Sequence, residues 1–103
     1  MDTDKKITKD AVIKTLRSNK VFIQNRYHVI EIGIFGSVLG GTNNPESDID
    51  VLVSFNQEGL TFRNYMGLKF YLEGLFGKKI DLVTKDNLKD IIKSKILSET
   101  AYA

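Results

Sequence analysis

The sequence contains no cysteine, no tryptophan, one proline and one histidine. Without cysteine, disulfide bonds, thiolate zinc sites and cysteine nucleophiles are excluded. His28 stands beside Tyr27 at the entrance to a predicted strand, where no second histidine can join it in a metal cluster or a triad. The chemistry of this chain is therefore sought among other residue types.

The excess of charge of one sign is also small, because 15 lysines and arginines nearly balance 13 aspartates and glutamates to give a formal net charge of +2. This excess does not by itself indicate a polyanionic or membrane partner, and we expect no membrane and no direct nucleic acid contact. Residues 1–6 are polar with no apolar run after them, so neither a signal peptide nor a membrane-spanning helix is predicted. At 103 residues, 42% of them hydrophobic, we expect one cytoplasmic domain over 1–103 with a modest core.

Apolar periodicity predicts alternating helices and strands. Helices are expected over 8–25, with an interruption at 18–19, over 61–76 with Gly77 as the stop, and from Asp86 or Asn87 to about 97. Strands are expected over 29–35, 48–55 and 80–83, with a short helical turn over 38–41, a loop over 42–47 and a turn over 56–59. This order predicts an α/β fold in which helices pack on a small mixed sheet.

Two aspartates open the second predicted strand. Asp48 and Asp50 are two residues apart, which places their side chains on one face about 6.5 to 7 Å apart. Carboxylates this close repel each other unless a cation lies between them. Mg²⁺ is the simplest candidate, because it takes one or two carboxylates and completes its shell with substrate phosphate oxygens.

A turn that suits phosphate precedes this pair. Gly36 allows the backbone to turn sharply, and Ser37 offers a hydroxyl and an amide N–H at the start of a short helix. Ser47 is placed either to hydrogen-bond a phosphate or a metal-bound water, or to cap the loop locally. The stretch from Ile32 to Val53 therefore predicts a metal and nucleotide site.

Asp81 is a third candidate, since it lies within the predicted strand Lys-Ile-Asp-Leu-Val. A carboxylate in such a strand is costly unless it is paired or bound to metal. If this strand lies beside the second, Asp81 reaches the same cluster. Three carboxylates can hold two Mg²⁺ ions about 3.5 to 4 Å apart, as in displacement at phosphorus. The alternative is a surface carboxylate paired with Lys79.

Gly36-Ser37, ten residues, and Asp48-x-Asp50 followed by apolar residues resemble the signature of the DNA polymerase beta-like nucleotidyltransferase superfamily. The small size points to its minimal nucleotidyltransferase (MNT) branch, whose members are often the antitoxin of HEPN/MNT toxin-antitoxin pairs. The resemblance implies Asp48 and Asp50 as ligands of the nucleotide-side metal. It implies that Asp81 completes the second metal and helps the acceptor hydroxyl to lose its proton.

The resemblance also implies a donor and a partner. The expected reaction is Mg²⁺-dependent transfer of AMP from ATP to a tyrosine of a HEPN ribonuclease toxin, within a hetero-oligomer. One departure weakens the case for tight triphosphate binding more than the case for the fold: where the family has Ala-Arg-Gly, this chain has Leu39, Gly40 and Gly41. Lys78, Lys79 and Arg63 are the available substitutes.

Two other functions remain open. The chain could neutralise its partner by binding alone, or transfer a nucleotide to a small-molecule hydroxyl. The short chain argues against the second, because nothing outside the minimal core is left to build a substrate pocket. The exposed parts of Phe62, Tyr65 and Phe70 are candidate contact surface for a partner.

Overall fold

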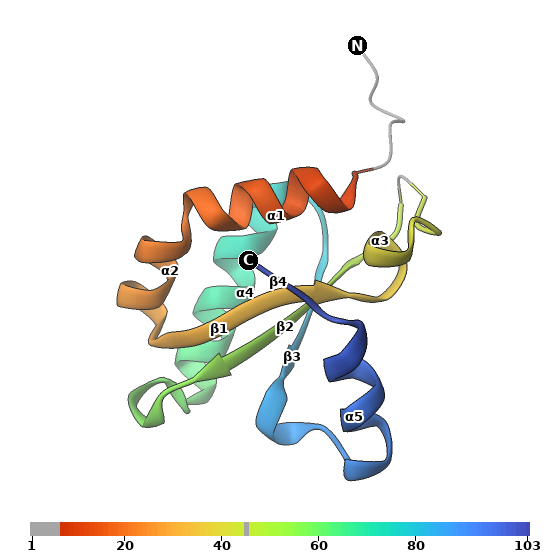
Figure 1. Cartoon of the computed structure of the whole chain (residues 1–103). Helices are drawn as coiled ribbons and strands as arrows, with labels where there is room; N and C mark the ends of the chain where they lie inside the picture. The colour runs from red at the N-terminus through yellow and green to blue at the C-terminus, as the bar shows by residue number, and fades with distance from the viewer. Residues whose placement is uncertain (1–6, 45) are drawn as a thin grey trace.

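The computed structural model describes residues 7–44 and 46–103; Pro45 and the polar residues 1–6 lie outside the described residues. Within them it contains five α-helices, two short 3-10 helices and one four-stranded sheet (Figure 1). The helices are α1 (Lys9–Ser18), α2 (Lys20–Tyr27), α3 (Gly36–Gly40), α4 (Phe62–Phe76), α5 (Asp90–Glu99), η1 (Gln57–Gly59) and η2 (Lys85–Asn87). The strands are β1 (Val29–Phe35), β2 (Ile49–Phe55), β3 (Ile80–Thr84) and β4 (Ala101–Tyr102).

The sheet is mixed and has the strand order β3-β2-β1-β4. β1 is antiparallel to both of its neighbours, whereas β2 and β3 are parallel. α4 connects β2 to β3 and passes behind the sheet in Figure 1, while α5 lies at the lower right and leads into the edge strand β4. This arrangement confirms the predicted α/β fold and places the third predicted strand beside the second.

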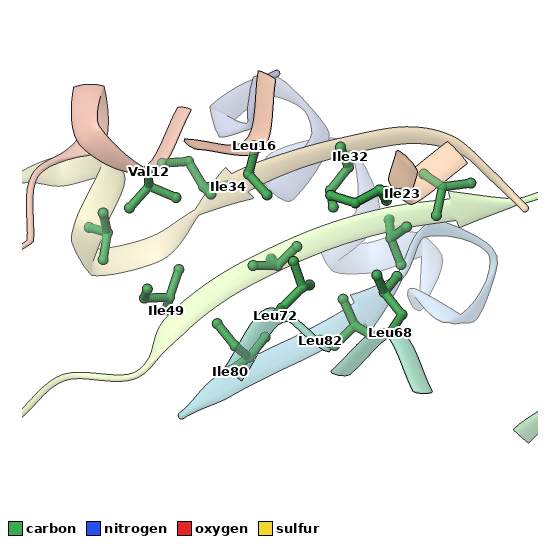
Figure 2. Close-up of a cluster of buried hydrophobic side chains, with 14 of the residues drawn as sticks. Val12, Leu16, Ile23, Ile32, Ile34, Ile49, Leu68, Leu72, Ile80 and Leu82 are labelled. Atoms are coloured by element: carbon green, nitrogen blue, oxygen red, sulfur yellow. The ribbon is translucent and has the colours of Figure 1, made fainter. Parts of the chain in front are cut away.

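The core lies between one face of the sheet and the helices α1, α2 and α4 (Figure 2). Leu16 and Leu72 supply fully buried side chains from the helices, and Ile34 and Val51 supply them from the strands. Each such aliphatic side chain stabilises the fold by about 1.5 to 3 kcal/mol through removal from water. Alternate strand residues point to the opposite side of the sheet, and this alternation is what brings Asp50 and Asp81 to the front.

The helix boundaries confirm most of the capping signals. The hydroxyl oxygens of Thr8 and Thr61 accept the backbone N–H groups of Ala11 and Asn64, and each replaces a missing bond of the first helical turn. Gly77 ends α4 with φ +62°, a conformation that glycine adopts without strain.

The C-terminal third differs from the prediction. Neither Asp86 nor Asn87 caps the last helix; both lie in η2, and α5 begins at Asp90 after an extended Lys89 that makes no side-chain cap. β4 was not predicted, because a two-residue strand carries too little periodicity to detect. The approach of β4 to β1 is close: a Cβ on Gly33 would lie 2.6 Å from the Ala101 carbonyl oxygen.

In the described ranges, no helix combines the length and the apolar character that crossing a membrane requires.

Candidate active site

The site begins where β1 ends and the chain turns into α3. Gly36 is the first residue of α3 and has φ +74°, in the left-handed region that glycine tolerates. A Cβ at this position would lie 2.1 Å from Asp50 Oδ2. Glycine is therefore needed at position 36 for two separate reasons, the backbone turn and the room taken by the Asp50 carboxylate.

Asp50 and Asp81 are direct neighbours across the parallel strands β2 and β3. Their carboxyl groups repel each other when both are ionised, so Asp81 favours the protonated form of Asp50. Burial of Asp50, followed by the charge and hydrogen bond of Asp81, raises the pKa of Asp50 to about 6. Asp50 is therefore able to exchange its proton for a cation near neutral pH.

The amide of Ser37 contributes in a way that the sequence did not reveal. It hydrogen-bonds the Asp50 carboxylate and so lowers the pKa of Asp50, partly offsetting the rise from burial and from Asp81. The N–H group predicted to meet phosphate instead positions a carboxylate. No periodicity or motif could show this, because the contact depends on how β1 and β2 are paired.

Asp48 lies immediately before β2, which begins at Ile49, so the predicted strand started one residue too early. Its side chain is exposed, and it has the smallest of the effects that raise the pKa of Asp50. In residues 7–44 and 46–103, no three His, Cys, Asp or Glu side chains form a preformed metal group. The structure thus brings Asp50 and Asp81 into contact and leaves Asp48 at the edge.

Ser47 shows the local role that was one of its two predicted alternatives. Its hydroxyl oxygen accepts the Asn44 backbone N–H at 2.9 Å, and its own N–H donates to the Asn44 carbonyl at 3.0 Å. Asn43, in the same loop, is buried and donates to the Ile7 carbonyl at 2.9 Å. These bonds hold the loop that leads into Asp48.

The three proposed substitutes for the missing arginine separate in space. Lys78 and Lys79 directly precede β3, and the Lys79 carbonyl accepts the Ile49 N–H at 3.0 Å, beside the aspartates. Arg63 lies in the first turn of α4, at the other end of β2. Arg63 is therefore excluded as a substitute, and only the two lysines remain near the site.

The donor set fits Mg²⁺ better than a softer metal. Asp50 and Asp81 supply only oxygen atoms, and one or two carboxylates are sufficient when substrate phosphates complete the coordination shell. The charge of Asp81 raises the pKa of Asp50, and a cation between the two carboxylates would relieve this repulsion.

Comparison with protein families and sequences gives consistent matches. The model of the nucleotidyltransferase domain family matches residues 14–103. The chain is similar to the protein adenylyltransferase MntA of Thermococcus cleftensis, with 36% identity over 96 residues that cover 93% of this chain and 96% of the relative. It is also similar to a Methanocaldococcus jannaschii protein assigned as a protein adenylyltransferase, with 34% identity over 93 residues that cover 89% and 93% of the two chains.

Solved structures agree on the fold. One assigned as a minimal nucleotidyltransferase has a TM-score of 0.78 and 28% identity, with 92% of this chain and 95% of that chain covered. A toxin-antitoxin structure with AMP-PNP has a TM-score of 0.65 and 23% identity, with coverage of 93% and 72%. A tri-AMPylated Shewanella oneidensis HEPN toxin in complex with MNT antitoxin gives 0.56 and 20%, with coverage of 91% and 66%. The last two likenesses concern the fold alone.

Proposed function

The chain belongs to the nucleotidyltransferase domain family, in its minimal branch, and we propose that it transfers AMP from ATP to a hydroxyl group of a protein partner. The observation that carries the proposal is the contact between Asp50 and Asp81 beside the turn at Gly36. Such a carboxylate pair suits a reaction in which negative charge on phosphate must be neutralised.

Each site residue has a role in this proposal. Asp48 and Asp50 would hold Mg²⁺ on the nucleotide side, and Asp81 would complete a second ion. Bound there, the ions would neutralise phosphate charge and polarise the bond that breaks. The Ser37 amide keeps the Asp50 carboxylate oriented, and Ser47 keeps a hydroxyl proton that can be donated to a phosphate oxygen.

The reaction itself requires little covalent chemistry of the protein. The acceptor oxygen forms a bond to the α-phosphorus of ATP, the bond to the bridging oxygen breaks, and pyrophosphate leaves. Asp81 is exposed on the front of the sheet, where its carboxylate can take the proton of the incoming hydroxyl. The remaining contribution is positioning.

The acceptor that relatives suggest is a HEPN toxin. The similar protein of Thermococcus cleftensis carries the name protein adenylyltransferase, and a structural neighbour is an MNT antitoxin in complex with an AMPylated HEPN toxin. We extend this to the present chain as an antitoxin that modifies a tyrosine of a HEPN-type partner in a hetero-oligomer. We place this activity in the cytoplasm, which the lack of cysteine suits.

Intact mass spectrometry tests the transfer. The protein encoded by the neighbouring gene is incubated with this chain, Mg²⁺ and each NTP in turn. We expect mass gains in whole AMP units with ATP, and none with Asp50→Asn, with Asp81→Asn or without metal. Gains that survive both substitutions would rule out the proposed site.

Neutralisation by binding is the second candidate. It is favoured by the lack of a basic side chain after the Gly36-Ser37 turn. Where the family has Ala-Arg-Gly, this chain has Leu39, Gly40 and Gly41. Under this alternative, the mass of the partner does not change and Asp50→Asn still protects cells from the toxin. Under the proposed transfer, the same variant loses protection.

A further inference from the structure

α4 carries an apolar stripe on the side that faces away from the sheet. Phe62, Met66 and Phe70 follow one another at four-residue intervals and therefore share one face of the helix. Phe62 is 78% exposed and Phe70 is 60% exposed, whereas Leu68 and Leu72 on the opposite side are fully buried. We refer to Phe62, Met66 and Phe70 as the outer stripe.

The surface predicted from the sequence also includes Tyr65, whose side chain is half-buried and whose hydroxyl donates to the Leu82 carbonyl of β3. Tyr65 lines a hollow next to Phe62. The stripe continues into Leu60, which is 56% exposed. Leu60 and Phe62 both line a hollow of about 440 Å³ whose wall includes Phe55, large enough to receive an apolar side chain.

A second hollow borders the other side of the stripe and carries more basic than acidic side chains. It has a volume of about 360 Å³, and its lining includes Arg26, Arg63, His28 and the acidic Glu58. Among the ion pairs of the described residues, His28 is matched with Glu58 at 3.6 Å, while Arg26 and Arg63 have no acidic partner. We refer to this as the arginine hollow. The Arg26 guanidinium lies over the Tyr27 ring, 5.1 Å from its centroid, and Arg63 lines the same hollow. Arginine side chains suit a carboxylate, which a guanidinium can bind with two hydrogen bonds.

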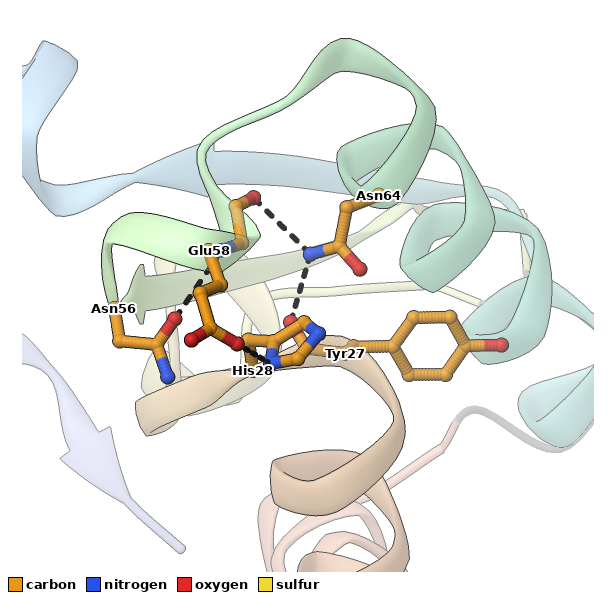
Figure 3. A network of polar contacts seen from close by, with 6 residues as sticks. Tyr27, His28, Asn56, Glu58 and Asn64 are labelled. Atoms are coloured by element: carbon orange, nitrogen blue, oxygen red, sulfur yellow. Dashed lines mark hydrogen bonds and ion pairs between the residues drawn. The ribbon is translucent and has the colours of Figure 1, made fainter.

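The backbone around the arginine hollow is held rigidly (Figure 3). The Asn64 side-chain amide donates to the Tyr27 carbonyl at 2.7 Å and to the Gly59 carbonyl at 3.1 Å. These bonds join the end of α2, η1 and the first turn of α4 (Figure 3). A surface fixed in advance binds a partner with less loss of conformational entropy.

We propose that the outer stripe and the arginine hollow together dock an apolar segment of the protein partner that carries acidic side chains. The choice of this partner rests on the proposed function, which requires a protein acceptor. Apolar side chains of the segment would cover Phe62 and Phe70, and a carboxylate would enter between Arg26 and Arg63.

A second copy of the chain fits this surface less well. In a two-fold contact this face would meet the same face of the other copy. Packing α4 against α4 would therefore bring Arg63 and Lys69 of both copies into one interface. Lys69 is neutralised by Glu73 at 2.9 Å, but Arg63 has no such partner among the described residues. Charge complementarity therefore favours an acidic partner.

The docking surface is also separate from the aspartates. It meets the sheet near Phe55, at the end of β2, whereas Asp50 lies near the beginning. Five residues of strand separate them by about 16 Å. A partner held here leaves the active site open, so binding and chemistry can be measured separately.

Binding of the neighbouring gene's product, measured by isothermal titration calorimetry without nucleotide or metal, tests the surface. We expect Phe70→Ser and Arg63→Glu each to weaken binding about tenfold or more, because both changes remove the contacts on which docking depends. Ile91→Ser is the matched apolar control, since Ile91 is 92% exposed on α5. Lys14→Glu on α1 is the matched charge control. Both controls should stay within about twofold of the wild type.

AMP transfer supplies the second readout. Phe70→Ser should raise the KM for the partner and leave kcat unchanged, because the docked surface does not touch the reacting atoms. Asp50→Asn should keep partner binding and lose transfer, so failure of catalysis and failure of docking are told apart. Thermal unfolding of each variant verifies its fold.

Three results would overturn the proposal. The first is the absence of binding by the wild-type chain, and the second is equal weakening by Phe70→Ser and Ile91→Ser. The third is a wild-type dimer in sedimentation that Phe70→Ser dissociates, which would assign the surface to a second copy.

Discussion

Asp50 and Asp81 are paired across the parallel strands β2 and β3, and the charge of Asp81 contributes to the raised pKa of Asp50. The two residues are far apart in sequence, and the β2-α4-β3 connection brings them into register. Folding holds these two carboxylates close together. The free energy of the folded state therefore depends on the protonation of Asp50 and on any cation bound between the carboxylates.

Stability should fall as pH rises in metal-free protein. The pKa of Asp50 is about 6 when folded and 3.8 for an unperturbed aspartate, so the folded state holds this proton more tightly. The stabilisation is complete below about 3.8 and is lost as pH rises through about 6. Between about pH 4 and about pH 7.5, after allowance for solvent screening, we expect wild type to lose about 1 to 2 kcal/mol relative to Asp50→Asn.

Urea unfolding at both pH values measures this difference. Comparison with Asp50→Asn cancels the titration of the carboxylates that are distant from Asp50. Parallel pH profiles of the two proteins would contradict the raised pKa.

Added Mg²⁺ should stabilise the wild type. A cation that binds only the folded state raises the free energy of unfolding by about 2.7 kcal/mol at a concentration of 100 Kd. The increase should be larger at pH 8 than at pH 5, because the proton on Asp50 competes with the metal. Thermal melts over a Mg²⁺ series measure the effect. Asp50→Asn and Asp81→Asn serve as controls, and an equal increase in either variant would place the ion elsewhere.

Gly36→Ala should lower the free energy of unfolding by more than backbone strain alone would. Gly36 and Gly41 both have φ +74°, so alanine at either position costs about 1 to 2 kcal/mol. At position 36 the new Cβ also meets Asp50 Oδ2 at 2.1 Å, whereas at position 41 nothing lies within 4 Å. Gly41→Ala is therefore the matched control, and the difference measures the clash. We expect about 1 to 3 kcal/mol more destabilisation for Gly36→Ala by urea unfolding, with loss of AMP transfer. Equal unfolding energies would show that Asp50 moves aside freely.

Gly33→Val should release the C-terminal strand. A Cβ on Gly33 would lie 2.6 Å from the Ala101 carbonyl oxygen and 2.8 Å from Thr100 Cγ2. β4 has only two residues and cannot offset this contact. We therefore expect amide hydrogen exchange in α5 and β4 to be faster in the variant than in the wild type, with a smaller change in β2. Gly74→Ala, with nothing within 4 Å inside α4, should instead stabilise by about 0.5 to 1 kcal/mol. Unchanged exchange in α5 would show that β4 shifts without detaching.

Local sequence signals located the elements well where a few neighbouring residues decide the structure. Thr8, Thr61 and Gly77 bound their helices as predicted, because capping depends on a few nearby atoms. The same reasoning failed for Asp86, which lies in η2 rather than at a helix cap, since the backbone is extended at Leu88 and Lys89 before α5 begins.

The sequence by itself determined the composition of the candidate site: a glycine-serine turn, two aspartates at a strand start and a third in a later strand. Residue type and spacing suffice for this, because strand alternation and turn geometry are local properties. Only the tertiary structure decided that Asp50 meets Asp81, that the Ser37 amide holds Asp50, and that Arg26 and Arg63 line one hollow. These relationships depend on strand register and helix packing, which join residues far apart in the chain and therefore leave no local pattern.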